Sequence, residues 1–275
     1  MPKQEILQNY ARLLVRTGCA LKPGQELLLT APVEAAPFAR LVAGEAWNAG
    51  AGDVIVEWAD QPVSRLRYLH ADAKAFESVP EWKRPLLNGA AERGAAILTL
   101  DGDDPDGMAG IDPARFTAWS RASHRDCKPF YGGMDLGRNV WCIAGAATPA
   151  WAKKVFPNLP ESEATEKLWD AILYTARADG ADPARAWADH SAAFRSRIKR
   201  LNKKGQRHRL PRWDESLPHL GRRGRRDGGR HLVLPQHAHR GDLHLPPPGP
   251  GRRRRPLRPA PQLPGRDDRG LLDPI

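Results

Sequence analysis

The sequence predicts an α/β fold with a mostly parallel sheet and flanking helices, followed by two long helices and a disordered tail. Short runs rich in Val, Ile and Leu alternate with helical segments over residues 1–156. Helical periodicity alone continues over residues 157–203, and the composition changes abruptly over residues 204–275. Short, uniformly apolar strands are typical of parallel sheets that helices cover on both faces. We therefore divide the chain into an N-terminal α/β domain (1–156), a helical connector (157–203) and a tail (204–275).

The first domain is expected to begin with an amphipathic helix. Apolar residues recur at intervals of three and four over residues 4–21, and the Lys-Pro-Gly turn at 22–24 ends the helix. The predicted strands cover residues 26–30, 53–58, 95–100 and 139–144. Further helices are predicted over residues 35–49, 63–71, 82–93, 113–126 and 149–156. The inner side of the helix over 35–49 is expected to carry Phe38, Leu41, Val42 and Trp47.

Two long helices are predicted after residue 160. The acidic residues from Glu161 to Glu166 complement the dipole at the start of the first helix, which is a structural role. Its apolar stripe consists of Leu168, Trp169, Ile172 and Leu173. Asp182 caps the second helix and Pro183 occupies its first turn. Trp187, Phe194 and Ile198 are its apolar positions, and we expect helical order to stop at Asn202.

The basic character of the chain belongs to its tail. The net charge is +11, but residues 206–275 hold 16 Arg against 7 Asp or Glu, which leaves only +2 for the first 205 residues. Residues 206–275 contain 12 Pro and no Lys, Thr, Phe, Tyr, Met, Cys or Asn. GC-rich DNA translated out of frame yields this kind of composition, and so much Pro and Arg with so little apolar content predicts disorder.

A one-base shift of the tail gives a sequence typical of folded protein. With third codon bases chosen among synonyms, residues 231–246 become TWFFPNMPTEEIFTSP. The same offset turns residues 207–209 into GTD and residues 260–273 into PLNYQGAMIEGFWI. Three coherent phrases at one offset are hard to obtain by chance. We therefore interpret residues 204–275 as an out-of-frame segment.

Residues 156–202 carry a family resemblance. FPNLPESEATEKLWDAILYTARADGADPARAWADHSAAFRSRIKRLN resembles the stretch that joins the two domains in the aminopeptidase T and aminopeptidase S family of two-metal aminopeptidases. The opening helix, residues 22–58 and the loop near Asp101 are similar to that family's N-terminal domain. The resemblance implies a connector to a catalytic domain, two divalent metal ions (Zn, Co, Mn or Mg), peptide substrates and a homodimer. It also implies hydrolytic release of N-terminal amino acids.

The resemblance places the family's metal ligands in the second domain. The earliest ligand is a glutamate in a phrase similar to NMPTEE, and in this chain Arg240 and Gly241 stand at that place. Arg240 is cationic and Gly241 has no side chain, so neither residue can ligate a divalent cation through a side chain. The later ligands would lie beyond Ile275. We therefore assign no catalytic, cofactor-binding or metal-binding residue. We expect the chain as printed to bind no metal and to leave peptides uncleaved.

Two other candidate metal sites are weak. Residues 101–107 (DGDDPDG) have the clustered carboxylates of a calcium loop, but Pro105 stands at the fifth position and Asp112 replaces the bidentate Glu at the twelfth. A solvated loop after a strand is the simpler interpretation, and such a loop can help to shape a cleft facing the second domain. The second candidate is a group of four tail histidines, His231, His237, His239 and His244. Histidine is a suitable metal ligand, but off-frame translation produces such clusters without selection, so we assign no metal site to them.

The alternative function is that of a non-catalytic protein whose basic tail binds nucleic acid weakly. The runs at 222–223, 225–226 and 252–255 would attract phosphates at low salt. Only Trp213 could stack on bases in the tail, so we expect no specific nucleic-acid partner.

Cysteine usage and hydropathy predict a cytoplasmic protein. Cys19, Cys127 and Cys142 form no CxxC motif and leave one thiol unpaired in any disulfide scheme, which favours a reducing compartment. No apolar run approaches the roughly 20 residues that span a bilayer, and no apolar signal core follows Met1, so we expect no membrane partner.

Overall fold

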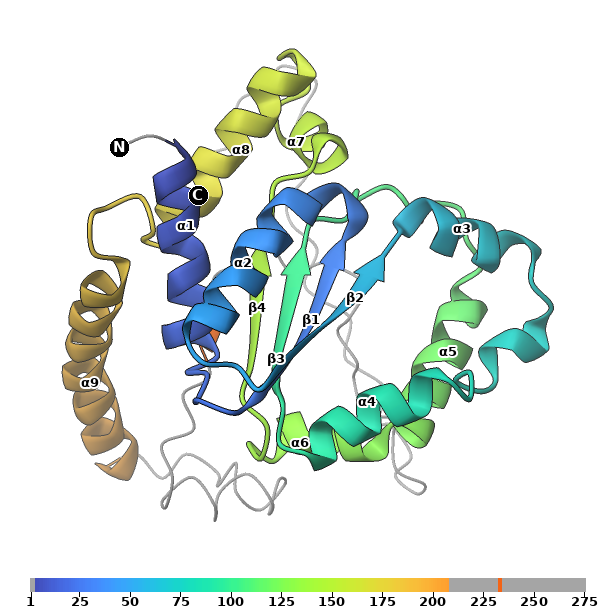
Figure 1. The fold of residues 1–275 in the computed structure, drawn as a ribbon, viewed down its shortest axis with the longest axis horizontal. Helices are drawn as coiled ribbons and strands as arrows, with labels where there is room; N and C mark the ends of the chain where they lie inside the picture. Colours follow the sequence, from blue (N-terminus) through green and yellow to red (C-terminus); the bar gives the residue numbers. More distant parts are fainter. Residues whose placement is uncertain (1–2, 208–231, 234–275) are drawn as a thin grey trace, which may run out of the picture. The chain divides into compact units, whose positions relative to one another are not determined.

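The computed structural model describes residues 3–207 and 232–233, and these residues form a parallel sheet covered by helices (Figure 1). The strand order is β2-β1-β3-β4-β5, and every neighbouring pair is parallel. The strands are β1 (Glu26–Pro32), β2 (Asp53–Ala59), β3 (Ala96–Asp101), β4 (Trp141–Gly145) and the two-residue β5 (Leu232–Val233). The predicted α/β class with flanking helices is therefore confirmed.

The helices follow the strands in the predicted alternation. They are α1 (Lys3–Leu13), α2 (Ala36–Asn48), α3 (Gln61–His70), α4 (Lys83–Glu92), α5 (Pro113–Asp126), α6 (Lys128–Asp135), α7 (Pro149–Val155), α8 (Glu161–Thr175) and α9 (Pro183–Arg207). Short 3-10 turns lie at Val33–Ala35 and Ala73–Phe76. No helix in the described ranges combines the length and the apolar character that crossing a bilayer requires.

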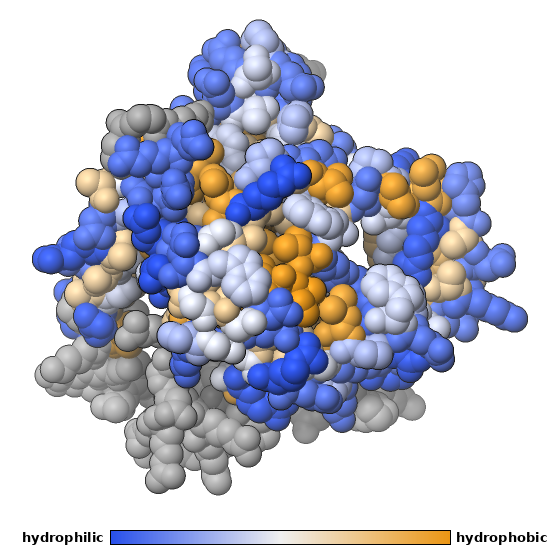
Figure 2. Space-filling view, in the orientation of Figure 1, coloured by the Kyte–Doolittle hydropathy of each residue, from blue (hydrophilic) through white to orange (hydrophobic). Residues whose placement is uncertain are grey.

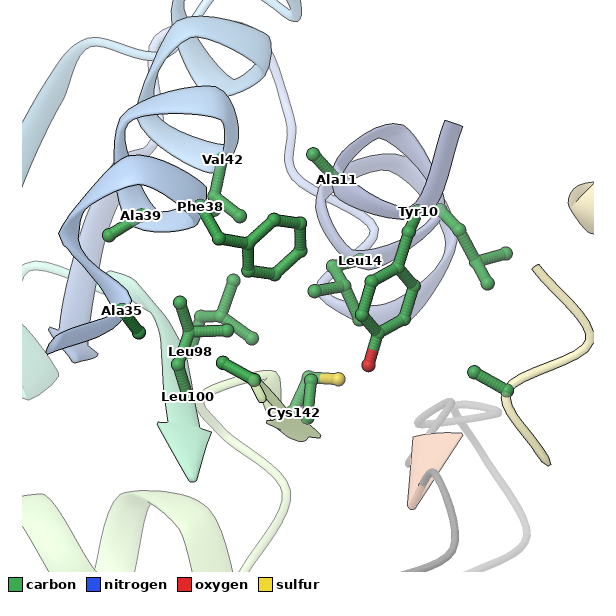
Figure 3. Close-up of a cluster of buried hydrophobic side chains, with 14 of the residues drawn as sticks. Tyr10, Ala11, Leu14, Ala35, Phe38, Ala39, Val42, Leu98, Leu100 and Cys142 are labelled. Carbon is green, nitrogen blue, oxygen red and sulfur yellow. The ribbon is translucent and has the colours of Figure 1, made fainter. Parts of the chain in front are cut away.

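One face of the sheet packs against α1, α2 and α8. Side chains that alternate along the strands, such as Leu27 and Leu29 in β1, lie in this core with Leu98 of β3. The Tyr10 ring stacks on the Phe38 ring with centroids 5.3 Å apart, and Trp169 meets Phe38 edge-on at 5.1 Å. Figure 3 shows Tyr10 and Phe38 between α1 and α2, above the strands. This aromatic contact joins the three helices that cover this face.

The opposite face packs against α4 and α6. Leu28, which points away from Leu27 and Leu29, lies in a second cluster with Leu87 of α4 and Cys127, the residue before α6. β1 is thus buried on both sides, which explains its continuous apolar run.

The first helix ends differently from the prediction. A π turn over Leu14–Gly18 follows α1, and Ala20 adopts a left-handed conformation with φ 45°. A Cβ at Gly18 would lie 2.9 Å from the Cys142 sulfur, so only glycine allows this close approach to β4. The prediction of regular helix to residue 21 is therefore wrong, because packing against β4 redirects the chain after Leu13.

Trp47 was expected on the inner side of α2, but its side chain is 53% exposed. At about 3.6 residues per turn, Trp47 lies roughly two and a half turns after Phe38 and so faces the opposite way. The inner position near the end of α2 belongs to Glu45, which is 4% exposed. Its carboxylate accepts a 2.7 Å hydrogen bond from Nε of Arg16, which compensates the charge that burial would otherwise leave unpaired.

Three further expectations need correction. The short helix α6 was not predicted, because its two adjacent glycines, Gly132 and Gly133, conceal it. Helix α9 continues past Asn202 to Arg207. Leu232 and Val233 belong to the tail expected to be disordered, yet they form β5 against Cys142 and Ile143. The rest of the predicted tail, residues 208–231 and 234–275, lies outside the described residues.

The predicted connector helices are present. Asp182 accepts a 2.9 Å hydrogen bond from the Arg185 amide, which is the expected cap of α9. Trp187 is buried and its Nε1 donates to the Ala176 carbonyl at 2.7 Å. Further along the same helix Phe194 and Ile198 are exposed, so of the three predicted apolar positions Trp187 is the buried one.

We predict that Phe38→Ala lowers the free energy of unfolding by about 3–5 kcal/mol, because it removes the ring shared by Tyr10 and Trp169. Trp47→Ala, a matched control on the same helix, should cost less than about 1 kcal/mol. Urea unfolding followed by circular dichroism measures both. Equal losses in the two variants would contradict the orientation of α2.

Candidate functional site

The carboxyl edge of the sheet is where an α/β fold of this kind places a functional site. The chain runs from β1 outward to β2 on one side and to β3 and β4 on the other, so the strand order reverses between β1 and β3. Open α/β sheets bind ligands outside the carboxyl ends of the strands at such a switch point. The loop after β3, residues 102–112, lies at this edge, as predicted for the aspartate-rich segment.

The crevice at the switch point is filled by protein. Gly102 is buried, and a Cβ on it would lie 2.6 Å from the Ala146 carbonyl oxygen, 2.7 Å from Cγ2 of Thr148 and 3.5 Å from Cγ of Pro32. The Thr148 hydroxyl donates to the Gly102 carbonyl, and the Ala146 amide donates to the Asp101 carbonyl at 2.8 Å. The ends of β1, β3 and β4 are therefore locked together by contacts that require glycine.

Helix α3 clamps the aspartate-rich loop from the other side. The Gln61 side chain makes two hydrogen bonds to Asp104: its Nε2 donates to the carbonyl at 3.0 Å, and its Oε1 accepts from the amide at 2.9 Å. Arg65 donates to the carbonyls of Gly107 and Ala109 at 3.0 and 2.8 Å. These contacts hold the loop through its backbone and leave its carboxylates at the edge of the sheet.

The carboxylates of the loop have structural partners. Asp106 pairs with Lys154 of α7, and this hydrogen bond raises the pKa of Lys154. Asp104 accepts from the Asp106 amide at 3.0 Å. Asp112, which a calcium loop would need as its twelfth residue, caps α5 by accepting from the Ala114 amide at 2.9 Å. The geometry supports the interpretation of a clamped surface loop.

An exposed apolar stripe lies on α3, the helix whose Gln61 and Arg65 hold this loop. Val63, Leu66 and Leu69, spaced three residues apart, are 59%, 55% and 46% exposed. Figure 2 shows apolar side chains at the surface over α3. Exposed apolar stripes of this kind are typical of surfaces that another domain or partner covers.

The described residues do not fit a metal pair. Within residues 3–207 and 232–233, no three side chains of His, Cys, Asp or Glu come together as metal ligands. His124 stacks on Tyr131 with centroids 4.2 Å apart, and His190 packs edge-on against Trp187 and Phe194. Arg240, Gly241, the tail histidines and the arginine runs lie outside the described residues. The acidic start of α8, with Glu161 and Glu163 exposed, has the expected structural place.

Helix α3 begins earlier than predicted, at Gln61 rather than at Val63. The signal was present in Asp60-Gln61-Pro62: Asp60 accepts from the Val63 amide at 2.9 Å, and Pro62 occupies the first turn. An Asp cap followed by Pro is a known mark of a helix start.

Comparison with known proteins shows what this domain belongs to. Residues 3–210 match the family described as thermophilic metalloprotease (M29). The chain is 37% identical over 200 residues to aminopeptidase PepS from Streptococcus thermophilus, covering 72% of this chain and 48% of that protein. It is also 37% identical over 196 residues to aminopeptidase T from Thermus thermophilus, covering 71% and 48%. The structure titled wild-type AmpT from Thermus thermophilus aligns with a TM-score of 0.66 and 34% identity, covering 73% of this chain and 49% of that chain.

The fold and these matches place the chain among the metalloproteases. It belongs to the M29 family, and the relatives it resembles are aminopeptidases. The predicted resemblance to the aminopeptidase T and S family is therefore confirmed. The match spans about half the length of these relatives.

We predict that Gly102→Ala lowers the free energy of unfolding by about 1–3 kcal/mol, because the new methyl group would overlap Ala146 and Thr148. Gly44→Ala is the matched control: Gly44 is exposed on α2 and a Cβ there meets nothing within 4 Å. This control should be neutral or more stable by up to about 1 kcal/mol. Thermal or urea unfolding gives both values, and a harmless Gly102→Ala would show that the strand ends are not locked as described.

Proposed function

We propose that this chain is the N-terminal half of a metal-dependent aminopeptidase, joined to an out-of-frame copy of the start of its catalytic domain. The observation that carries this proposal is the position where the family match ends. The match covers residues 3–210, and the arginine- and proline-rich composition without Lys or Thr begins at residue 206. A one-base change of frame between Asn202 and Arg207 accounts for both changes at once.

The described part of the chain is suited to supporting a catalytic domain. Relatives named as aminopeptidases are about twice as long as the matched segment. We place the metal ions and peptide cleavage in the half of the enzyme that corresponds to their remaining length. The exposed stripe of Val63, Leu66 and Leu69 beside the clamped loop supports a domain contact at the carboxyl edge of the sheet.

The chain as printed is proposed to be inactive. Arg240 and Gly241 stand where the family resemblance calls for the first metal ligand, and neither can supply a carboxylate. Two divalent ions would polarise the scissile carbonyl and activate water in the intact enzyme. Peptide substrates, a homodimer and a cytoplasmic location are likewise proposed for the intact enzyme. Three buried, unpaired thiols are consistent with a reducing compartment.

We predict that the purified chain, supplied with zinc, cobalt or manganese, hydrolyses a leucyl chromogenic substrate at least about a thousandfold more slowly than a working enzyme of this kind. The matched control is protein made from the same gene, including the DNA downstream of the codon for Ile275, after the frame has been restored by one base. Restored protein should release the chromophore, and its activity should disappear with a chelator. Turnover by the unrestored chain would overturn the inactivity proposal, and an inert restored protein would overturn the frame proposal.

A further inference from the structure

Two buried thiols lie close together beneath the first helix. Cys19 follows the π turn and is 0% exposed, while Cys142 in β4 is 1% exposed. The Cys19 thiol donates to the Ile97 carbonyl at 3.9 Å, and the Cys142 thiol donates to the Ile143 carbonyl at 3.8 Å. Both sulfurs therefore belong to the same core, where β3 and β4 meet the end of the first helix.

The backbone brings the two residues together by an unusual path. After the π turn over Leu14–Gly18, Gly18 lies against Cys142 of β4, the Cys19 thiol lies against the Ile97 carbonyl of β3, and Ala20 is left-handed. At Gly18 the approach to the Cys142 sulfur leaves no room for a side chain, and Cys19 is the next residue. Figure 3 shows the Cys142 sulfur in the core near Leu14 and Tyr10. The neighbouring thiols are thus held by rigid parts of the fold.

The environment keeps Cys19 protonated. The neighbouring Cys142 side chain raises the pKa of Cys19 most, followed by burial. Burial likewise raises the pKa of Tyr10. Because the thiolate is the reactive form, the raised pKa of Cys19 slows its reaction with an oxidant.

We propose that Cys19 and Cys142 are a latent disulfide pair that ties the end of the first helix to β4 when a peroxide oxidant is present. One thiolate attacks a peroxide oxygen, the O–O bond breaks, and a sulfenic acid and water form. The second thiol attacks the sulfenic sulfur, an S–S bond forms, and the S–O bond breaks with loss of a second water. Two thiols and one hydrogen peroxide thus give one disulfide and two waters.

Cys127 cannot take part in this pair. It lies in the cluster on the opposite face of the sheet, with Leu28 and Leu87. The charged groups that influence its pKa are Asp126, Lys83, Arg84 and Glu57, and neither Cys19 nor Cys142 is among them. The fold therefore predicts one specific linkage out of the three that the cysteines allow.

The test treats the reduced, folded full-length chain with hydrogen peroxide and then alkylates the remaining thiols in denaturant. We expect the free thiols to fall from three to one, and a peptide map to show Cys19 linked to Cys142. Formation should be faster at higher pH, because the thiolate is the attacking form. The urea midpoint of the oxidised chain should rise, because the cross-link restricts the unfolded state.

Cys127→Ala is the matched control and should form the same linkage at the same rate, whereas Cys19→Ala should form none. If Cys19→Ala does not fold, the peptide map of the unaltered chain still decides the question. Chain oxidised in urea should give a mixture of linkages, which checks that the selectivity comes from the fold. Three free thiols after exposure that oxidises the urea-treated chain would overturn the proposal. A linkage to Cys127 in the folded chain would overturn it equally.

Discussion

The stack of Tyr10 on Phe38 is the contact on which the arrangement of this domain depends. The Tyr10 side chain is completely buried, so its hydroxyl needs a protein acceptor, and it donates to the Gly145 carbonyl at 3.3 Å. One residue of α1 is thereby fixed both to α2, through the ring, and to the end of β4, through the hydroxyl. Trp169 of α8 completes the contact from the other side of Phe38. Gly18, at the end of the π turn that follows α1, then lies close to Cys142 of β4.

The sequence alone predicted the helices and strands that are marked by residue patterns within the element itself. β1 and β3 are short apolar runs, and α5 occupies the predicted range because Asp112 and Pro113 mark its start. Trp47 was predicted to face the core, although its spacing from Phe38 places it on the opposite side of α2. The π turn after Leu13 could not be predicted, because its cause is contact between Gly18 and Cys142, residues far apart in the chain.

In the candidate site, too, features marked by local patterns were predicted and contacts between distant residues were not. Parallel-sheet topology places the aspartate-rich loop at the carboxyl edge, and this position was predicted. The clamp by Gln61 and Arg65 joins residues more than forty positions apart, so no local pattern could indicate it. The metal ligands expected from the family resemblance correspond to positions outside the described residues, and that part of the prediction stays a prediction.

The proposed junction between the family domain and the out-of-frame segment lies just after the last long helix. Its physical basis is the coincidence between the end of the family match at residue 210 and the start of the Lys-free composition at residue 206. Independent sequencing of the coding DNA between the codons for Asn202 and Arg207 tests it most directly. The account predicts one base gained or lost relative to a frame that stays open well past the codon for Ile275. An intact present frame, with the shifted one interrupted by stop codons, would contradict it.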